Sequence, residues 1–227
     1  MTEKLVLISQ PRIYPHISYL SKIAQSDLYV CSDDLLLTPS LFERRNLYWN
    51  FDSGDARYLL VPTNKGYLFG DTKITDLGFA ARHRRILRDS YRFAKDVPFF
   101  NDSILNYLVF DAENDSFLEY FKEQLRRIFD LFGIKTEIAF ASEVHSMNRK
   151  VNRLNDILRY FGATRYLSGI CGKDYIKDDL CVPVVFHNTL TPRFRANPHT
   201  DKMLLYIDNI FYMGIDYIRR IIFDEEV

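Results

Sequence analysis

A short loop rich in hydrogen-bonding side chains follows the apolar run at residues 5–9. Along the loop and just after it stand Gln10, Arg12, Tyr14, His16 and Tyr19. A loop that only reverses the chain usually contains Gly, Asn or Asp instead. Amide, guanidinium and phenol groups donate hydrogen bonds to anions, and an imidazole can also act as a general base. The loop is therefore a candidate ligand-binding segment.

We expect a helix to begin near His16, and the free N–H groups of a helix N-terminus bind anions. The stretch PHISY resembles, in degenerate form, the HxGH turn with which nucleotidyl transferases contact nucleotide phosphates. Ser18 and Tyr19 stand where that turn has its Gly and its second His. The alternative is that His16 only caps the helix beside Pro15.

Polar residues also follow two other predicted strands. Asp33 and Asp34 come after the strand at 27–32, and Asp34 is a candidate general base or metal ligand, although paired acids also form ordinary turns. The strand RYLSG at 165–169 runs into a turn, and this junction contains Ser168, Gly169, Lys173, Asp174 and Tyr175. Ligands of open α/β sheets bind at the carboxyl ends of the strands. We therefore expect one pocket there, lined by Gln10, His16, Asp34, Arg45 and Ser168.

The elements that must position these groups follow from apolar periodicity. Five short apolar runs predict strands at 5–9, 27–32, 136–142, 165–169 and 182–188. Helical spacing predicts helices at 16–25, 80–94, 116–132, 148–162 and 199–214, while residues 101–110 are ambiguous. The helix at 116–132 has the clearest limits, because Ser116 with Glu119 forms a capping box and Gly133 suits its end.

This alternation of strands and helices predicts an α/β fold with a mainly parallel central sheet flanked by helices, Rossmann-like or nucleotidyl-transferase-like. The strand at 5–9 should be interior because it is apolar throughout. The segments 41–51 and 56–63 straddle the turn signal DSGD and predict a β-hairpin insertion. Arg45 on this hairpin is suited to bidentate recognition of phosphate or carboxylate.

Composition excludes several classes of function. The chain has 227 residues, with 30 Lys and Arg balanced by 30 Asp and Glu, so no global field attracts nucleic acid or anionic membrane. Its three cysteines form no CxxC pair, its histidines have no metal-ligand spacing, and no Walker loop, GxGxxG or GxSxG is present. No apolar run approaches the roughly 20 residues of a membrane span. We expect a cytoplasmic protein, and the sequence identifies no cofactor.

Several motifs in order along the chain resemble the WbqC-like protein family. Its opening pattern of Gln-Pro, Tyr-x-Pro, a helix start and a strand ending in Asp corresponds to ISQPRIYPHISYLSKIAQSDLYVCSDD. Further matches are Arg45-Asn46, the segment GFAARHRRILRDSYRFAKDVPFF with His83, the stretch RYLSGICGKDYI, and a closing helix with Asp208 and Gly214. Two departures mark a divergent member, since Ser18 replaces a Gly and LLLTPSLFE replaces a basic-aromatic run.

The resemblance covers nearly all of residues 1–227, which we treat as one domain. It implies a transferase acting on a nucleotide-activated or carrier-linked substrate, for example in acyl or aminoacyl transfer to an amino sugar during surface-polysaccharide (O-antigen) biosynthesis. The candidate catalytic residues are His16, Asp34 and His83. The candidate substrate-binding residues are Gln10, Tyr14, Tyr19, Arg45, Asn46, Ser168, Gly169, Tyr175 and Asp208.

A second hypothesis is a binding or assembly module that has lost its chemistry. In that reading the aromatic side chains of Tyr48, Trp49, Phe51, Tyr67 and Phe69 serve a partner, and stacking on single-stranded nucleic acid is one variant. The alternative for these residues is that half of them face the core. A small, phosphorylated substrate is the partner expected under the first hypothesis, nucleic acid stays open under the second, and the oligomeric state is open under both.

Overall fold

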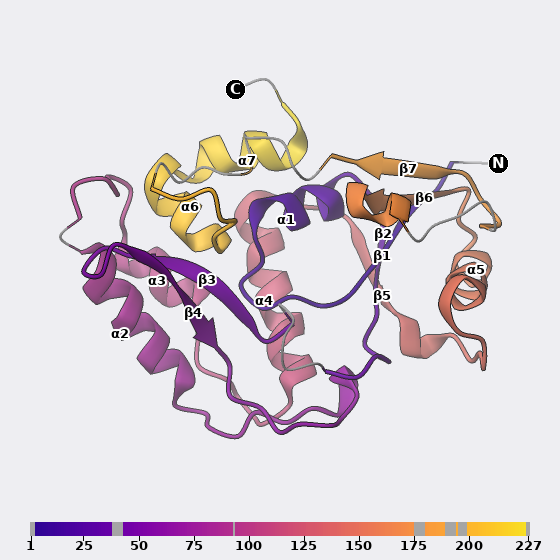
Figure 1. The fold of residues 1–227 in the computed structure, drawn as a ribbon, viewed down its shortest axis with the longest axis horizontal. Coiled ribbons are helices and arrows are strands. Elements are labelled where there is room, and N and C mark those ends of the chain that lie inside the picture. Colours follow the sequence, from indigo (N-terminus) through magenta and orange to yellow (C-terminus); the bar gives the residue numbers. More distant parts are fainter. Residues whose placement is uncertain are drawn as a thin grey trace.

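The computed structural model describes residues 3–37, 43–92, 94–174, 180–188, 194 and 199–225. Within them, five parallel strands form one sheet in the order β5-β2-β1-β6-β7 (Figure 1). The strands are β1 (Leu5–Ser9), β2 (Leu28–Cys31), β5 (Glu137–Phe140), β6 (Arg165–Gly169) and β7 (Val184–His187). The predicted α/β fold is confirmed, and β1 is interior as its apolar sequence predicts.

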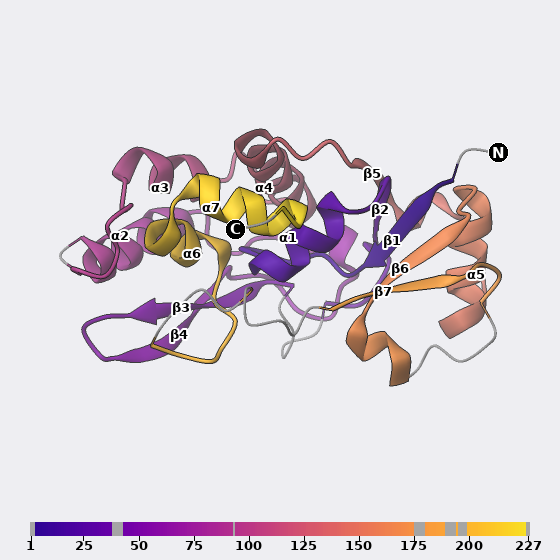
Figure 2. The same cartoon turned by 90° about the horizontal axis from the view of Figure 1, so that it is seen from above.

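Helices cover both faces of this sheet (Figure 2). On one face lie α1 (Ile17–Ala24) and α4 (Phe117–Phe132), with α7 (Ile215–Phe223) packed against α1. On the other face lies α5 (Lys150–Tyr160). Side chains alternate along β1, so Leu7 joins the first hydrophobic core while Val6 and Ile8 join the second.

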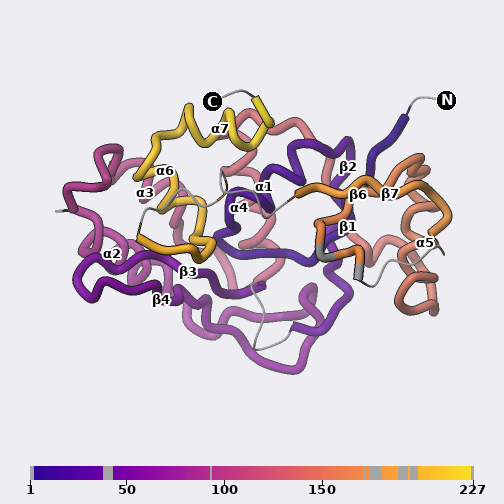
Figure 3. Tube along the Cα trace, turned by 45° about the horizontal axis from the view of Figure 1, so that its top comes forward, coloured from indigo at the N-terminus to yellow at the C-terminus, as the bar shows by residue number. Residues whose placement is uncertain are grey.

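A long insertion separates β2 from β5 and extends to the end of the molecule opposite α5 (Figure 3). It contains the antiparallel hairpin of β3 (Arg45–Asn50) and β4 (Asp55–Leu60), which confirms the predicted hairpin. After the short 3₁₀ helix η1 (Phe69–Asp71) come α2 (Phe79–Tyr91) and α3 (Asp102–Leu108), and the insertion ends with α4. The side chain of Asn101 caps α3 by accepting from the N–H groups of Ser103 and Ile104, which resolves the ambiguous segment as a helix.

Local capping sets the limits of α4 where the sequence predicts them. The Ser116 hydroxyl accepts a hydrogen bond from the Glu119 N–H at 3.3 Å. At the other end Gly133 adopts φ 74°, a left-handed conformation that a side chain disfavours. The helix is amphipathic and contributes Phe121, Leu125 and Ile128 to the larger core.

The C-terminal region differs from the prediction. The helix expected at 199–214 is shorter, because α6 (Tyr206–Met213) begins only after Leu205. Leu205 is extended, and its N–H donates to the Leu47 carbonyl of β3 at 2.8 Å, so this part of the chain bonds to the hairpin instead of to itself. Helix α7 follows after Gly214, and the sequence analysis did not predict it. Short 3₁₀ helices, η2 (Ala141–Glu143) and η3 (Ile170–Asp174), follow β5 and β6.

Candidate functional site

A hollow of about 570 Å³, which we call the sheet-edge pocket, lies at the carboxyl ends of β1, β2 and β6. The sheet order reverses here, because the chain passes from β1 to β2 on one side while β6 lies on the other. In open parallel sheets this switch point is where ligands bind, because the loops after neighbouring strands diverge. The pocket has a polar half, formed by Gln10, Arg12, His16, Ser18 and Lys22, and an apolar half, formed by Ile8, Leu35, Leu154 and Tyr166.

The loop that carries the polar half is held by contacts from distant elements. The N–H of Tyr14 donates to the Gln124 side chain at 2.9 Å, and the Gln124 amide donates to the Arg12 carbonyl at 3.2 Å. The Asn46 side chain donates to the Tyr14 carbonyl at 2.7 Å. Tyr14 has φ 48°, an uncommon conformation for a residue with a side chain. The hydrogen bonds from α4 and β3 stabilise that conformation and set the direction in which the loop enters α1.

His16 caps α1 and faces the pocket as a neutral imidazole. Its Nδ1 accepts from the Tyr19 N–H at 3.3 Å and lies 2.7 Å from the Ser18 hydroxyl. Burial, with the positive charges of Arg12 and Lys22, lowers the pKa of His16 to about 3. Because Nδ1 is an acceptor in this neutral ring, the proton resides on Nε2. The side chain is therefore set as a hydrogen-bond donor.

Two cations give the polar half its charge. The Arg12 guanidinium lies 5.6 Å and the Lys22 ammonium 5.7 Å from the centre of the Tyr19 ring, so both are gathered around one aromatic side chain. Among the described residues that line the pocket there is no Asp or Glu. A pocket lined by cations and hydrogen-bond donors without a carboxylate favours an anionic ligand.

Tyr19 itself supports the pocket from beneath. It is fully buried, and its hydroxyl donates to the Gln10 carbonyl at 2.9 Å. The hydroxyl of Tyr29 on β2 lies 2.6 Å from that of Tyr19. Burial raises the pKa of both phenols, so both stay protonated and available as donors. This pair fixes the point at which the chain leaves β1.

Of the five side chains predicted to line one pocket, the structure brings together Gln10 and His16, and Gly169, another candidate site residue, lies beside them. The prediction was wrong for the other three, Asp34, Arg45 and Ser168, which do not line the pocket. Ser168 lies next to it but is 3% exposed, and its hydroxyl donates to the Gly169 carbonyl at 3.2 Å. Tyr175 lies outside the described residues.

Two predicted residues lie apart from the pocket lining and have other contacts. Asp34 pairs with Arg153 of α5 at 2.6 Å, and Arg153 also donates to the carbonyls of Ala141 and Val144. Arg45 lies on the hairpin, with its guanidinium 4.3 Å from the centre of the Tyr58 ring.

Tyr14 and His83 meet in the interior behind the loop. The Tyr14 hydroxyl lies 3.2 Å from His83 Nδ1 and 3.1 Å from the Tyr120 hydroxyl. His83 Nε2 lies 3.2 Å from the Leu60 carbonyl, and burial lowers the pKa of His83 to about 4. The ring is therefore neutral and bridges α2, the hairpin and the loop.

Asp208 and Asn46 also lie inside the protein. The Asp208 side chain is fully buried and accepts from the Trp49 N–H at 2.8 Å. Burial raises the pKa of this carboxyl well above its usual range. Asn46, also fully buried, holds the loop through the Tyr14 carbonyl. These two side chains are thus engaged with the backbone of the hairpin and the loop.

Several pocket residues were not among the predicted site residues. Ser18 and Lys22 project from the same side of α1, and their i, i+4 spacing after His16 is a signal that could have identified them. Leu154 and Tyr166 belong to the smaller core, and their position at the pocket depends on how α5 packs on the sheet. No local pattern indicates that packing.

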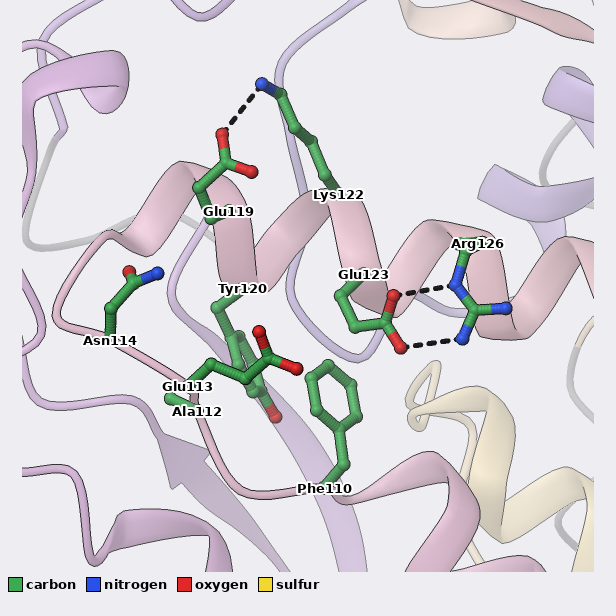
Figure 4. A pocket seen from close by; sticks show the side chains of 9 residues that line it. All are labelled: Phe110, Ala112, Glu113, Asn114, Glu119, Tyr120, Lys122, Glu123 and Arg126. Carbon is green, nitrogen blue, oxygen red and sulfur yellow. Dashed lines mark hydrogen bonds and ion pairs between the residues drawn. The ribbon is translucent and has the colours of Figure 1, made fainter.

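A second hollow, of about 270 Å³, lies between α4 and the loop 110–114 (Figure 4). The stacked rings of Phe110 and Tyr120 line it, with centroids 4.6 Å apart. Its charged rim consists largely of ion pairs within α4, namely Glu119 with Lys122 at 2.8 Å and Glu123 with Arg126 at 2.7 Å. Such pairs are ordinary on a solvated helix and contribute little. The sheet-edge pocket, where loops from separate strands converge, is the stronger candidate.

The aromatic residues of the binding-module hypothesis divide between core and surface. Tyr48 and Phe69 are buried, whereas Tyr67 is 51% exposed. Trp49 stacks on the imidazole of His199 at 5.5 Å, and the ring of Phe51 meets the same imidazole edge-on at 5.7 Å. They do not form one exposed platform on which successive bases could stack.

The described residues form neither a metal-binding cluster nor a membrane-spanning helix. In the part of the chain that the structure describes, no three His, Cys, Asp or Glu side chains gather in a way that could hold a metal ion. None of the described helices combines the length and the apolar character that crossing a membrane requires.

Comparison with known proteins agrees with the motifs in the sequence. The sequence model of the WbqC-like protein family matches residues 10–219. The uncharacterised protein Rv1507c of Mycobacterium tuberculosis is 27% identical over 180 residues, which cover 77% of this chain and 76% of that protein. No solved structure gives a significant match. The matched range includes the whole polar half of the pocket.

Proposed function

The chain belongs to the WbqC-like protein family, and from that premise we propose a transferase that binds a nucleotide-activated or carrier-linked substrate in the sheet-edge pocket. The observation that carries this proposal is the polar half, where the side chains of Arg12, Lys22 and the donor His16 converge on one pocket. Phosphate groups are the anions common to both kinds of activated substrate, and a switch point of a parallel sheet is where such groups bind.

We assign each polar residue a role from its chemistry and its place in the lining. Arg12 and Lys22 neutralise the phosphate charge, and the Gln10 amide orients the group attached to it. His16 donates from Nε2 to a phosphate oxygen. A general-base role suits it less, because Nδ1 already accepts from the Tyr19 N–H. The transferred group, such as an acyl or aminoacyl group delivered to an amino sugar, is the part of the proposal that rests on the family alone.

Thermal denaturation with a panel of nucleotides and nucleotide-sugars, with and without Mg²⁺, tests the proposal. A ligand at 100 times its Kd stabilises the folded state by about 2.7 kcal/mol, which raises the melting temperature measurably. Lys22→Gln should reduce the shift for every phosphorylated ligand. Lys65→Gln is the matched control, because Lys65 is exposed and outside the pocket. The proposal fails if no ligand moves the wild-type melting temperature, or if the two variants respond alike.

A further inference from the structure

The apolar half of the sheet-edge pocket has chemistry that a phosphate group alone does not use. Ile8 and Tyr166 are core residues of neighbouring strands, and Leu154 of α5 packs against the same core. Leu35, in the turn after β2, is 44% exposed although it lines the hollow. Ile8 and Tyr166 are already buried, so most of the apolar area that a ligand could remove from water belongs to Leu35 and Leu154.

The two halves are separate groups of residues. The cations of the polar half gather around Tyr19, on the α1 side of the sheet. Ile8, Leu154 and Tyr166 belong to the core on the α5 side. A volume of about 570 Å³ lies in the range of sites that enclose small organic molecules, which are mostly apolar with a few polar groups that fix orientation.

We infer that the ligand of this pocket is an organic phosphate whose phosphate lies against Arg12, His16 and Lys22 and whose organic group lies against Leu35, Leu154 and Tyr166. This inference rests on the proposed function and adds the orientation and the amphipathic class of the ligand. The organic group is either a nucleoside, whose base packs on the apolar half, or an alkyl or acyl chain. The two kinds of ligand have in common a phosphate joined to a weakly polar organic group.

Isothermal titration with two pairs of probes tests this inference. The pairs are uridine diphosphate against pyrophosphate, and hexyl phosphate against inorganic phosphate. The organic member of at least one pair should bind about tenfold tighter or more, which is the gain expected when the ligand covers one leucine side chain. The pair that shows the larger ratio identifies the organic group as a nucleoside or an alkyl chain.

Adjacent leucines provide the variant and its control. Leu35→Asn should reduce the ratio of organic-probe affinity to inorganic-probe affinity several-fold in the pair where that ratio is larger. The binding of inorganic phosphate and pyrophosphate should stay unchanged. Leu36→Asn should leave both unchanged, because Leu36 is 59% exposed and does not line the pocket. Both side chains are substantially exposed, so neither change should prevent folding.

The outcomes separate this inference from the proposed function. If inorganic anions bind as tightly as their organic partners, or if Leu35→Asn and Leu36→Asn have the same effect, the inference is overturned and an anion site remains. If none of the four probes binds while a nucleotide-sugar still raises the melting temperature, the inference is overturned and the proposed function stands; if no ligand of either set binds, both fail. If Lys22→Gln weakens the binding of all four probes and Leu35→Asn weakens the binding of the organic probes alone, the inference and the proposed function both stand.

Discussion

The hydroxyl groups of Tyr19 and Tyr29 lie 2.6 Å apart in the interior, and Tyr19 passes the hydrogen bond on to the Gln10 carbonyl. Three segments of the chain are thereby joined, since Tyr19 belongs to α1, Tyr29 to β2 and Gln10 to the end of β1. Chains of hydrogen bonds between buried groups strengthen one another, and each is costly to interrupt. The pair therefore controls the position of Gln10, the first residue of the polar half of the pocket.

Removal of these hydroxyls should give unequal and coupled losses of stability. Tyr29→Phe takes away the bond to Tyr19 and a long contact of 3.5 Å to the Ser9 carbonyl, and it should cost about 1 kcal/mol. Tyr19→Phe leaves the Gln10 carbonyl without its donor and should cost about 1–3 kcal/mol. The double variant should cost less than the sum, because the two residues share one bond. Urea unfolding of the two single variants and the double variant measures this. Additive losses would contradict the coupling.

His83 should make stability depend on pH. The unfolded chain takes up the imidazole proton near pH 6.5, and the folded state only near pH 4. Between these values the unfolded state binds more protons, so stability falls as the pH drops through this window. The difference is about 3 kcal/mol at most. His83→Gln does not titrate and should make this part of the profile less steep, as measured by urea unfolding from pH 7 to pH 4; His16, whose pKa is also lowered, keeps its own share of the slope. An unchanged slope would show that the ring is already protonated in the folded state.

Asp208 should make the protein less stable as the pH rises, which is the opposite of the effect of His83. The folded-state pKa of Asp208 is raised by burial, so the folded state holds a proton that the unfolded chain releases near pH 3.8, and stability falls as the pH rises above that value. Asp208→Asn can still accept from the Trp49 N–H without a proton, so it should be more stable than the wild type at neutral pH. Each pH unit between the two pKa values is worth about 1.4 kcal/mol. Equal stability at pH 7 would contradict a protonated Asp208.

Asp34 can be tested as a metal ligand and as an ion-pair partner in one experiment. Its bond to Arg153 is half-buried, at 2.6 Å, so Asp34→Asn should cost about 1 kcal/mol. Arg153→Met should cost more, because it also leaves the carbonyls of Ala141 and Val144 without their donor. Melting curves with and without Mg²⁺ distinguish the roles. A wild-type shift that Asp34→Asn abolishes would assign Asp34 to a metal instead.

Local signals predicted the elements, and long-range contacts determined the site. Ser116 and Gly133 mark the ends of α4 because capping depends only on neighbours along the chain. The edge of the sheet that carries the pocket follows from strand order and the residues after β1. By contrast, Gln124 holds the loop at Tyr14 and Arg153 pairs with Asp34 across more than a hundred residues. Neither contact has a pattern in its own segment, so the sequence could not indicate that Asp34 has an arginine partner or that the loop depends on α4.

His16 combines a structural and a ligand-binding role that two substitutions should separate. Its Nδ1 accepts from the Tyr19 N–H and caps α1, while the residue lines the pocket and its neutral ring holds the proton on Nε2. His16→Ala removes both functions, and loss of a cap costs about 1 kcal/mol. His16→Asn keeps a side-chain oxygen that can cap, because Asn is among the best residues at that position, but it lacks the donor at the Nε2 position. Only the Ala variant should therefore lose stability in urea unfolding.

Both variants should bind pyrophosphate several-fold more weakly than the wild type in isothermal titration, because the lost donor is common to them. The fold-change should not depend on the salt concentration, because the lost donor is neutral and the electrostatic contacts with Arg12 and Lys22 remain in both variants. If His16→Asn binds pyrophosphate as tightly as the wild type, His16 is only a cap. The anion would then be held by the two cations alone, and the stiff loop before α1 would serve to position Arg12.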